Sequence, residues 1–196
     1  MEKITSSNLV LASSSPRRLD IMNSLGYQPQ VYNSAAQEIF IGDPAEIVCH
    51  NALAKARAAG EKFPDKYIIA ADTIVVKDGE ILGKPQNAAD ARRMLELLSA
   101  SMHKVYTASV LLKRDENKEF VDYNTTKVLL KPLSEQEIQL YIESGEPLDK
   151  AGAYGIQGRG AVFVERIEGD YGTVVGLSPS LLYDLLKSYR ISSLIL

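Results

Sequence analysis

A strongly β-prone and mostly apolar run, YIIAADTIVV, spans Tyr67–Val76. Within it only Asp72 and Thr73 are polar, so the run predicts a strand in or near the centre of a sheet. A carboxylate at such a place needs a cation, a metal ion or several hydrogen-bond donors, because burying an unpaired charge is costly. Asp72 is therefore a candidate functional residue, with a structural carboxylate bonded to a neighbouring loop as the alternative.

Strand and helix signals alternate on both sides of this run. Asp78-Gly79 is a hairpin signal, and Ser15-Pro16 is typical of a helix start. The remaining patterns predict helices from Ser15 to Gly26, Asp43 to about Gly60, Ala88–Ser99, Ser134 to about Ser144 and Leu181–Tyr189, and strands at Leu9–Ala12, Val31–Ser34, Glu80–Leu82, Val105–Leu112, Phe120–Leu130 and Ala161–Ile167. The fold class expected is α/β (α+β mixed), a long twisted mixed sheet flanked by helices. No linker is evident, so residues 1–196 are expected to form a single domain with two lobes and a central cleft.

Composition excludes several classes of protein. The chain has 196 residues, of which 45% are hydrophobic and 24% charged, as in ordinary globular proteins. A net charge of −3 argues against a nucleic-acid binder that works by bulk charge. No apolar run approaches the ~18 residues of a membrane span, and the single cysteine fits a reducing compartment. We expect a soluble, cytoplasmic protein without membrane contact.

The segment SSSPRR, residues Ser13–Arg18, combines hydroxyl side chains, a helix N-terminus and two arginines. Free backbone N–H groups and guanidinium donors suit phosphate oxygens. The pattern indicates an anion site, with an ordinary capped surface helix as the alternative. It is not a Walker A loop, because the spacing G-x-x-x-x-G-K-[ST] is absent from the sequence.

A glycine-rich stretch follows the predicted helix that ends near Ser144. Gly152–Gly160 contains four glycines in nine residues, and Gln157 carries an amide that could bond to the edge of a base. A structureless loop of this length is uncommon in a compact domain unless it is functional. Taken alone, Glu38, Lys55 and Lys84 resemble ordinary exposed residues.

Together these motifs resemble the Maf (septum formation inhibitor-like) family of nucleoside triphosphate pyrophosphatases, which is related in fold to the inosine triphosphate pyrophosphatases. The resemblance runs in order from about Leu9 to Tyr189. It is carried by LASSSPRR at Leu11–Arg18, ADT at Ala71–Thr73, GKP at Gly83–Pro85 and DKAGAYGIQG at Asp149–Gly158.

The resemblance implies roles for nine residues. Asp72, Lys84, Lys55 and Glu38 match catalytic positions, and Ser13 and Arg18 match phosphate-binding ones. Glu38 and Asp72 would hold a divalent metal ion, Mg²⁺ or Mn²⁺, and Asp72 would be the general base. Arg17, Thr73 and Gln157 match the subfamily that prefers dTTP and UTP, whereas the 7-methyl-GTP subfamily has Trp, Gln and Glu there.

The implied reaction is hydrolysis of dTTP or UTP, and of modified pyrimidine triphosphates, to the monophosphate and pyrophosphate by water attack on the α-phosphorus. Gln37 replaces a second glutamate common beside Glu38, and Ala100 replaces a glycine usual at that turn. Two alternatives stay open: the same chemistry on a modified purine such as 7-methyl-GTP, and a nucleotide-binding regulator of cell division with little turnover. The partner expected is a small nucleotide, and a homodimer is compatible with the fold.

Overall fold

The computed structural model describes residues 8–189, which form two compact units. Unit 1 contains the chain up to Asp72, Thr107–Asn124 and the chain from Gly176 onward. Unit 2 contains Thr73–Tyr106 and Thr125–Val175. The chain therefore passes between the units several times, in agreement with the two lobes expected from the sequence. Within residues 8–189, no helix is both long enough and apolar enough to cross a membrane.

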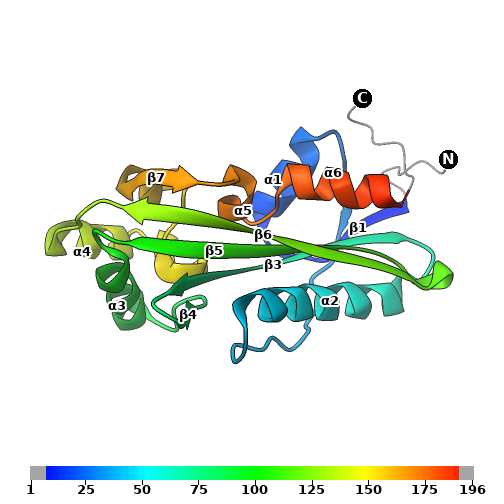
Figure 1. Ribbon diagram of the computed structural model, residues 1–196, viewed down its shortest axis with the longest axis horizontal. Helices are drawn as coiled ribbons and strands as arrows, with labels where there is room; N and C mark the ends of the chain where they lie inside the picture. Colours follow the sequence, from blue (N-terminus) through cyan, green and yellow to red (C-terminus); the bar gives the residue numbers. More distant parts are fainter. Residues whose placement is uncertain (1–7, 190–196) are drawn as a thin grey trace. The chain divides into compact units, whose positions relative to one another are not determined.

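The strands form a seven-stranded mixed sheet in the order β2-β1-β3-β5-β6-β7, with β4 paired to β3 (Figure 1). Strand β1 runs parallel to β2 and to β3, whereas β4 is antiparallel to β3, and β7 to β6. The predicted mixed sheet is thus confirmed. The bounds are β1 (Leu9–Leu11), β2 (Gln30–Val31), β3 (Tyr67–Lys77), β4 (Glu80–Leu82), β5 (Met102–Lys113), β6 (Lys118–Leu130) and β7 (Val164–Glu168).

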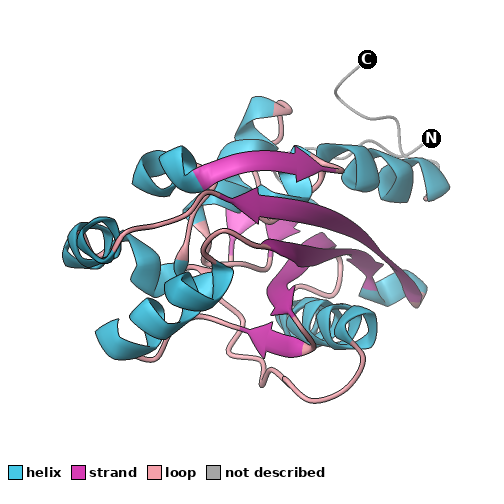
Figure 2. Ribbon diagram, turned by 60° about the vertical axis from the view of Figure 1, so that its left-hand side comes forward, coloured by secondary structure: helices cyan, strands magenta, loops and turns pink. Residues whose placement is uncertain are grey.

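Helices flank the strands, as Figure 2 shows. Several begin where sequence signals place a cap: the Asp43 carboxylate accepts bonds from Ala45 and Glu46 N–H, and Ser134 with Glu137 forms a complete capping box. The α-helices are α1 (Pro16–Ser24), α2 (Pro44–Lys62), α3 (Ala88–Leu98), α4 (Glu135–Glu143), α5 (Tyr171–Val175) and α6 (Pro179–Ser188). The 3₁₀ turns are η2 (Arg114–Glu116), η3 (Glu146–Asp149), η4 (Ala151–Ala153) and η5 (Gly158–Phe163).

Unit 1 has its own core, built on alternate residues of its strands. Tyr67, Ile69 and Ala71 of β3 pack in one cluster with Met22 of α1 and with leucines of α6. Because successive strand residues point to opposite faces, Ile68, Ala70 and Asp72 face the other side, where α2 lies (Figure 1). This alternation turns the Asp72 carboxylate toward α2.

Unit 2 has a second core. Val75 of β3, Val105 of β5 and Val128 of β6 pack with buried residues of α3 and α4. The amphipathic pattern of α3 buries Ala91, Met94, Leu95 and Leu98 on one side, as the sequence predicts.

Two predicted elements differ from the structure, and one short helix was not predicted. Strand β2 is limited to Gln30–Val31, not Val31–Ser34, although Tyr32 N–H still bonds to Leu11 C=O at 3.0 Å. Residues 161–163 were expected in a strand but belong to η5, and β7 begins only at Val164. The short helix α5 was not expected. Asp170 begins it by accepting bonds from the Thr173 N–H and hydroxyl, at 2.7 and 2.9 Å.

Candidate active site

Helix α2 and strand β3 bring an ion cluster together in unit 1. Lys55 Nζ lies 2.6 Å from Asp72 Oδ1 and 2.6 Å from Glu38 Oε1. The Asp72 and Lys55 side chains are only 7% and 13% exposed, whereas Glu38 is 38% exposed. One ammonium group therefore joins a buried carboxylate to a more accessible one. Of the partners expected for a buried Asp72 carboxylate, the structure shows a cation, Lys55.

Asn51 completes the surroundings of Asp72, although no motif of the sequence marks it. It lies one helical turn before Lys55 on α2, so both side chains point to the same face. Its amide nitrogen donates to Asp72 Oδ2 at 3.1 Å and to Ile39 C=O at 3.1 Å, and its oxygen accepts from Ile39 N–H at 2.9 Å. Asn51 thus ties the segment that carries Glu38 to the Asp72 carboxylate.

The predicted anion segment forms a compact group at the start of α1. Arg18 donates to Ser13 Oγ at 3.1 Å and, through Nε, to Gly176 C=O at 2.7 Å. Ser15 N–H also donates to Ser13 Oγ, at 3.2 Å, while the Ser15 side chain makes no cap bond. Ser15 is the N-cap residue as predicted, but Ser13 provides the hydroxyl that organises the turn.

The charges of these two groups in unit 1 affect one another. Burial lowers the pKa of the Arg18 guanidinium, the Asp72 charge raises it, the neighbouring Arg17 lowers it, and Glu38 raises it, with a net decrease. Arg18 therefore lies within electrostatic range of both carboxylates. The structure brings together the six expected residues of unit 1: Ser13, Arg17, Arg18, Glu38, Lys55 and Asp72.

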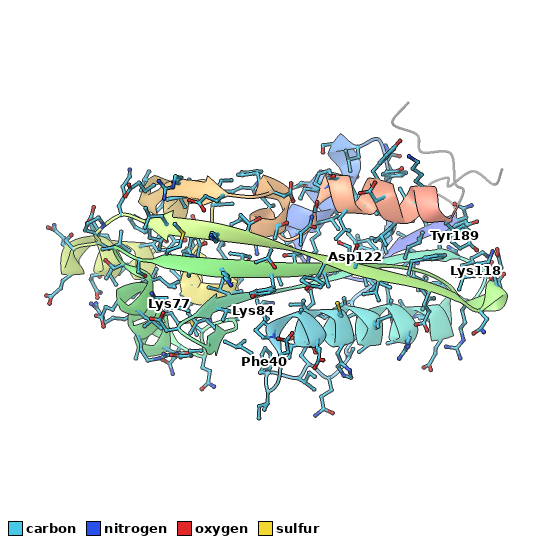
Figure 3. The ribbon with its side chains drawn as sticks, in the orientation of Figure 1. Phe40, Lys77, Lys84, Lys118, Asp122 and Tyr189 are labelled. Carbon is cyan, nitrogen blue, oxygen red and sulfur yellow. The ribbon has the colours of Figure 1, made fainter. Side chains whose placement is uncertain are left out.

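Unit 2 carries the other three expected residues, Thr73, Lys84 and Gln157. Lys84 follows β4 and is exposed (Figure 3). Its ammonium group forms no ion pair with any residue of the described range, 8–189. Gln157 is also exposed, and its amide has no hydrogen-bond partner among those residues. Both side chains are thus available to a ligand.

The glycine-rich stretch packs on the hairpin formed by β3 and β4. Gly152 N–H donates to Gly83 C=O at 3.0 Å, directly before Lys84. A Cβ atom at Gly152 would meet Val75 at 3.0–3.1 Å, and the φ angle of +69° favours glycine. This contact connects the loop of Gln157 to the strand that begins, in unit 2, with Thr73.

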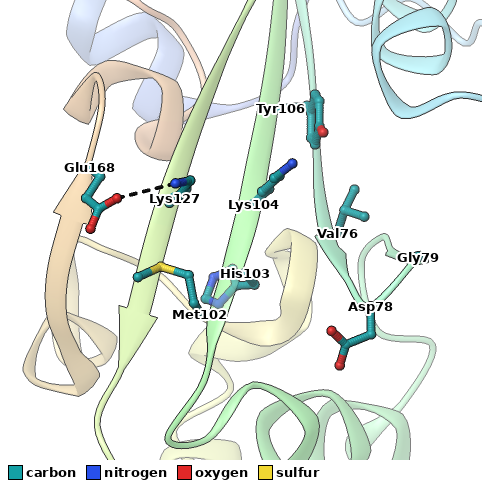
Figure 4. Close-up of a pocket in the computed structure, with 9 residues that line it drawn as sticks. All are labelled: Val76, Asp78, Gly79, Met102, His103, Lys104, Tyr106, Lys127 and Glu168. Atoms are coloured by element: carbon teal, nitrogen blue, oxygen red, sulfur yellow. Dashed lines mark ion pairs between the residues drawn. The ribbon is translucent and has the colours of Figure 1, made fainter.

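A separate pocket of about 470 Å³ lies in unit 2, but none of its lining residues belongs to the expected site (Figure 4). Two charged side chains of its lining form an ion pair, with Lys127 Nζ 3.6 Å from Glu168 Oε2. His103 Nε2 lies 2.8 Å from the Tyr154 hydroxyl, and burial lowers the pKa of His103 to about 4. The lining residues are Val76, Asp78, Gly79, Met102, His103, Lys104, Tyr106, Lys127 and Glu168.

The fold has a counterpart among solved structures. The Ham1 protein of Staphylococcus aureus superposes with a TM-score of 0.52 at 13% sequence identity, covering 92% of this chain and 98% of that one. At this identity the likeness concerns the fold alone. The mixed α/β architecture expected from the sequence therefore has a solved counterpart.

Sequence comparison identifies the family. The family model described as Maf-like protein matches residues 8–189, and the chain belongs to this family. A dTTP/UTP pyrophosphatase of Dictyoglomus thermophilum is 44% identical over 182 residues, covering 91% of this chain and 94% of that protein. A protein of the same name from Bacillus cereus is 44% identical over 185 residues, covering 93% of this chain and 96% of that protein. The resemblance inferred from the motifs is confirmed.

Proposed function

We propose that this protein is a nucleoside triphosphate pyrophosphatase that hydrolyses dTTP and UTP to the monophosphate and pyrophosphate. The observation that carries the proposal is the buried Asp72 carboxylate, held by Lys55 and Asn51 within electrostatic range of Arg18. A carboxylate surrounded by cations suits a reaction that needs both a proton acceptor and neutralised phosphate charge. The names of the relatives, at 44% identity over most of the chain, support the substrates.

The donor atoms of the cluster fit a hard divalent ion such as Mg²⁺ or Mn²⁺. Residues 8–189 contain no group of three or more His, Cys, Asp or Glu side chains placed to hold a metal. Mg²⁺ commonly uses one or two carboxylates together with substrate phosphates, and Glu38 and Asp72 provide such a pair. When bound, the ion would neutralise phosphate charge and make a water molecule more acidic.

The other side chains of the site have separate roles in the proposed reaction. Arg18, Lys55 and Lys84 neutralise the triphosphate, and Ser13 with the start of α1 donates hydrogen bonds to it. A water oxygen bonds to the α-phosphorus while the bond from that phosphorus to the bridging oxygen breaks. Pyrophosphate leaves with the bridging oxygen, and Asp72 receives the proton of the water.

Arg17, Thr73 and Gln157 select the pyrimidine base in this proposal. The exposed amide of Gln157 has a donor and an acceptor, which match the alternating acceptors and N–H donor of a uracil or thymine edge. A base that leaves such groups unpaired is rejected strongly. The same argument favours pyrimidines over 7-methyl-GTP, whose subfamily carries a glutamate in place of Gln157.

We also propose that the chain is one catalytic domain, since a single family model matches residues 8–189. We also propose that the protein is located in the cytoplasm, and a homodimer is compatible with this function. A nucleotide-binding regulator without turnover would not need a carboxylate in the position of Asp72. For that reason we favour a pyrophosphatase over a regulator that only binds nucleotides.

Pyrophosphate release from dTTP, UTP, CTP, the purine triphosphates and 7-methyl-GTP, with Mg²⁺ or Mn²⁺, tests the proposal. We expect preferential turnover of dTTP and UTP, and a loss of at least about 100-fold in kcat for Asp72→Asn. Asp65→Asn, which removes an exposed carboxylate of unit 1, is the matched control and should keep wild-type turnover. Preference for 7-methyl-GTP would overturn the base assignment, and binding without turnover would favour the regulator.

A further inference from the structure

Glu146, in the turn after α4, binds the backbone on the far side of the glycine-rich stretch. Its Oε2 accepts from Arg159 N–H at 3.0 Å, and its Oε1 accepts from Gly160 N–H at 3.1 Å and from the Tyr141 hydroxyl at 3.0 Å. Burial raises the pKa of Glu146, but the two backbone N–H donors, the Tyr141 hydroxyl and the charge of Lys150 together lower it below its ordinary value. The carboxylate therefore stays charged and keeps strong, charge-assisted bonds to the loop.

Tyr141 extends this network to the near side of the same loop. Its hydroxyl oxygen accepts from Gly155 N–H at 3.1 Å while donating to Glu146. One phenol thus connects the residue where the loop begins to the carboxylate that binds its end. The loop between these contacts is Gly155–Gly160, which we call the base loop.

The glycines of the base loop allow this close approach. A Cβ atom at Gly160 would stand 2.5 Å from the Tyr141 hydroxyl and 2.6 Å from Gly155 C=O, distances that side chains do not tolerate. Gly158 has a φ angle of +74°, and a Cβ atom there would meet Glu146 Oε2 at 2.9 Å. The two ends of the base loop are therefore closed against one another around Tyr141 and Glu146.

Gln157 lies between these fixed points. Its backbone is held within two residues on each side, by the bonds of Gly155 and Arg159, yet its amide is exposed and unpaired among residues 8–189. A short loop that is fixed at both ends but presents a free amide is pre-organised for a ligand, because little order has to be gained on binding.

We propose that Glu146 and Tyr141 are positioning residues that determine base discrimination by holding the base loop, and with it Gln157, in place. The inference rests on the proposed function, since it concerns the residue assigned there to the pyrimidine base. Neither side chain touches substrate in this scheme. Their effect is transmitted through the backbone bonds to Gly155, Arg159 and Gly160.

The test compares Glu146→Gln and Tyr141→Phe with the wild type, using dTTP and dCTP, which differ at the base edge. The measured quantity is the ratio of kcat/KM for dTTP to that for dCTP. A fraction of unfolded or inactive enzyme lowers both values equally and cancels in the ratio, so a merely structural role would leave the ratio unchanged. Glu143→Gln, an exposed change on the same helix α4, is the matched control.

We expect the ratio to fall by about tenfold in Glu146→Gln and by about threefold or more in Tyr141→Phe, with Glu143→Gln equal to the wild type. Amide hydrogen exchange at residues 155–160 should be faster in both loop variants. Tyr141→Phe removes one hydroxyl only and keeps the test usable if Glu146→Gln fails to fold.

An unchanged ratio in a folded loop variant would overturn the inference while leaving the proposed function intact. Wild-type enzyme without turnover of dTTP would instead show that the proposed function itself is wrong.

Discussion

Asn51 is the residue whose role is most difficult to foresee, because both of its partners are distant along the chain. Ile39 is 12 residues away and Asp72 is 21 residues away, and only folding brings them to the amide. Asn51→Leu would leave one oxygen of the buried Asp72 carboxylate without its amide donor and would remove both bonds to the Ile39 backbone. We expect a loss of about 2–3 kcal/mol in the free energy of unfolding, measured by urea denaturation.

The control for that variant is Asn23→Leu, which changes an exposed asparagine on α1. It should alter the free energy of unfolding by less than about 0.5 kcal/mol. Equal stability of Asn51→Leu and the wild type would contradict the anchoring role of Asn51.

His103 makes the stability of the protein depend on pH. Burial lowers its pKa to about 4, with a smaller contribution from the charge of Lys77, whereas the unfolded chain has the ordinary value of about 6.5. The unfolded state therefore binds more protons between these values, so stability is complete above about pH 6.5 and falls as the pH drops toward 4. The expected loss is on the order of 3 kcal/mol.

Melting temperatures at pH 7 and pH 4.5 check this expectation when wild type and His103→Gln are compared. Glutamine keeps a polar partner for the Tyr154 hydroxyl but has no titrating group. The drop in melting temperature on acidification should therefore be smaller in the variant. An equal drop in both proteins would show that carboxylates alone cause the acid sensitivity.

Motif residues of the site could be predicted from the sequence, while their supporting residues could not. Ser13, Arg18 and Asp72 carry chemistry that is visible in the residue type and the local pattern, whereas Lys55 was selected only through the family resemblance. In the structure Lys55 is paired with Asp72, and Arg18 donates to Ser13. Tyr141, Glu146 and Asn51 act only through tertiary hydrogen bonds, so nothing in their local sequence distinguishes them from ordinary helix and turn residues.

Among the elements, those with a cap signal were predicted well and those shaped by distant contacts were not. Asp43-Pro44 and the Ser134–Glu137 box gave correct helix starts, because a cap is a local interaction. Residues 161–163 have the apolar pattern of a strand, but they follow the backbone groups that Glu146 binds and continue as a 3₁₀ turn. The start of α5 does carry a local signal, Asp170, which accepts from the Thr173 N–H, but one capping residue before so short a helix is a weak pattern.

The turn after α3 contains a residue in an unfavourable backbone conformation. Ala100 has a φ angle of +53°, and its N–H bonds to Lys131 C=O at 3.1 Å, which holds the turn in this shape. The left-handed region costs an L-residue about 1–2 kcal/mol, and glycine avoids this penalty at a smaller entropic cost. Ala100→Gly should therefore raise the free energy of unfolding by about 0.5–1 kcal/mol.

The same change at Ala58, half-buried inside α2, should act in the opposite direction. Ala58→Gly should lower the free energy of unfolding by about 1 kcal/mol, because glycine is a poor helix former. Denaturant titrations of the two variants measure both effects. If Ala100→Gly destabilises the protein as the helix variant does, the positive φ angle of Ala100 does not lower the stability of the protein.

At the scale of the whole molecule, strands β3, β5 and β6 each contribute residues to both units. The unit boundary falls between Asp72 and Thr73 on β3, two adjacent residues to which the proposed function gives different roles. Neither unit is a continuous piece of chain, so neither is expected to fold without the other. We therefore expect a single cooperative unfolding transition.

A non-hydrolysable dTTP analogue with an α,β-methylene bridge, added with Mg²⁺, tests this cooperativity together with the assigned binding residues. Ligand at about 100 times its Kd stabilises the folded state by about 2.7 kcal/mol, which for a chain of this size corresponds to roughly 5–10 °C in melting temperature. Because the proposed ligand residues belong to both units, the whole transition should move as one. Gln157→Ala removes an exposed, unpaired amide, so it should keep the unliganded melting temperature and lose much of the shift. A second transition that does not respond to the analogue would instead mean that the units unfold independently and that the nucleotide binds only one of them.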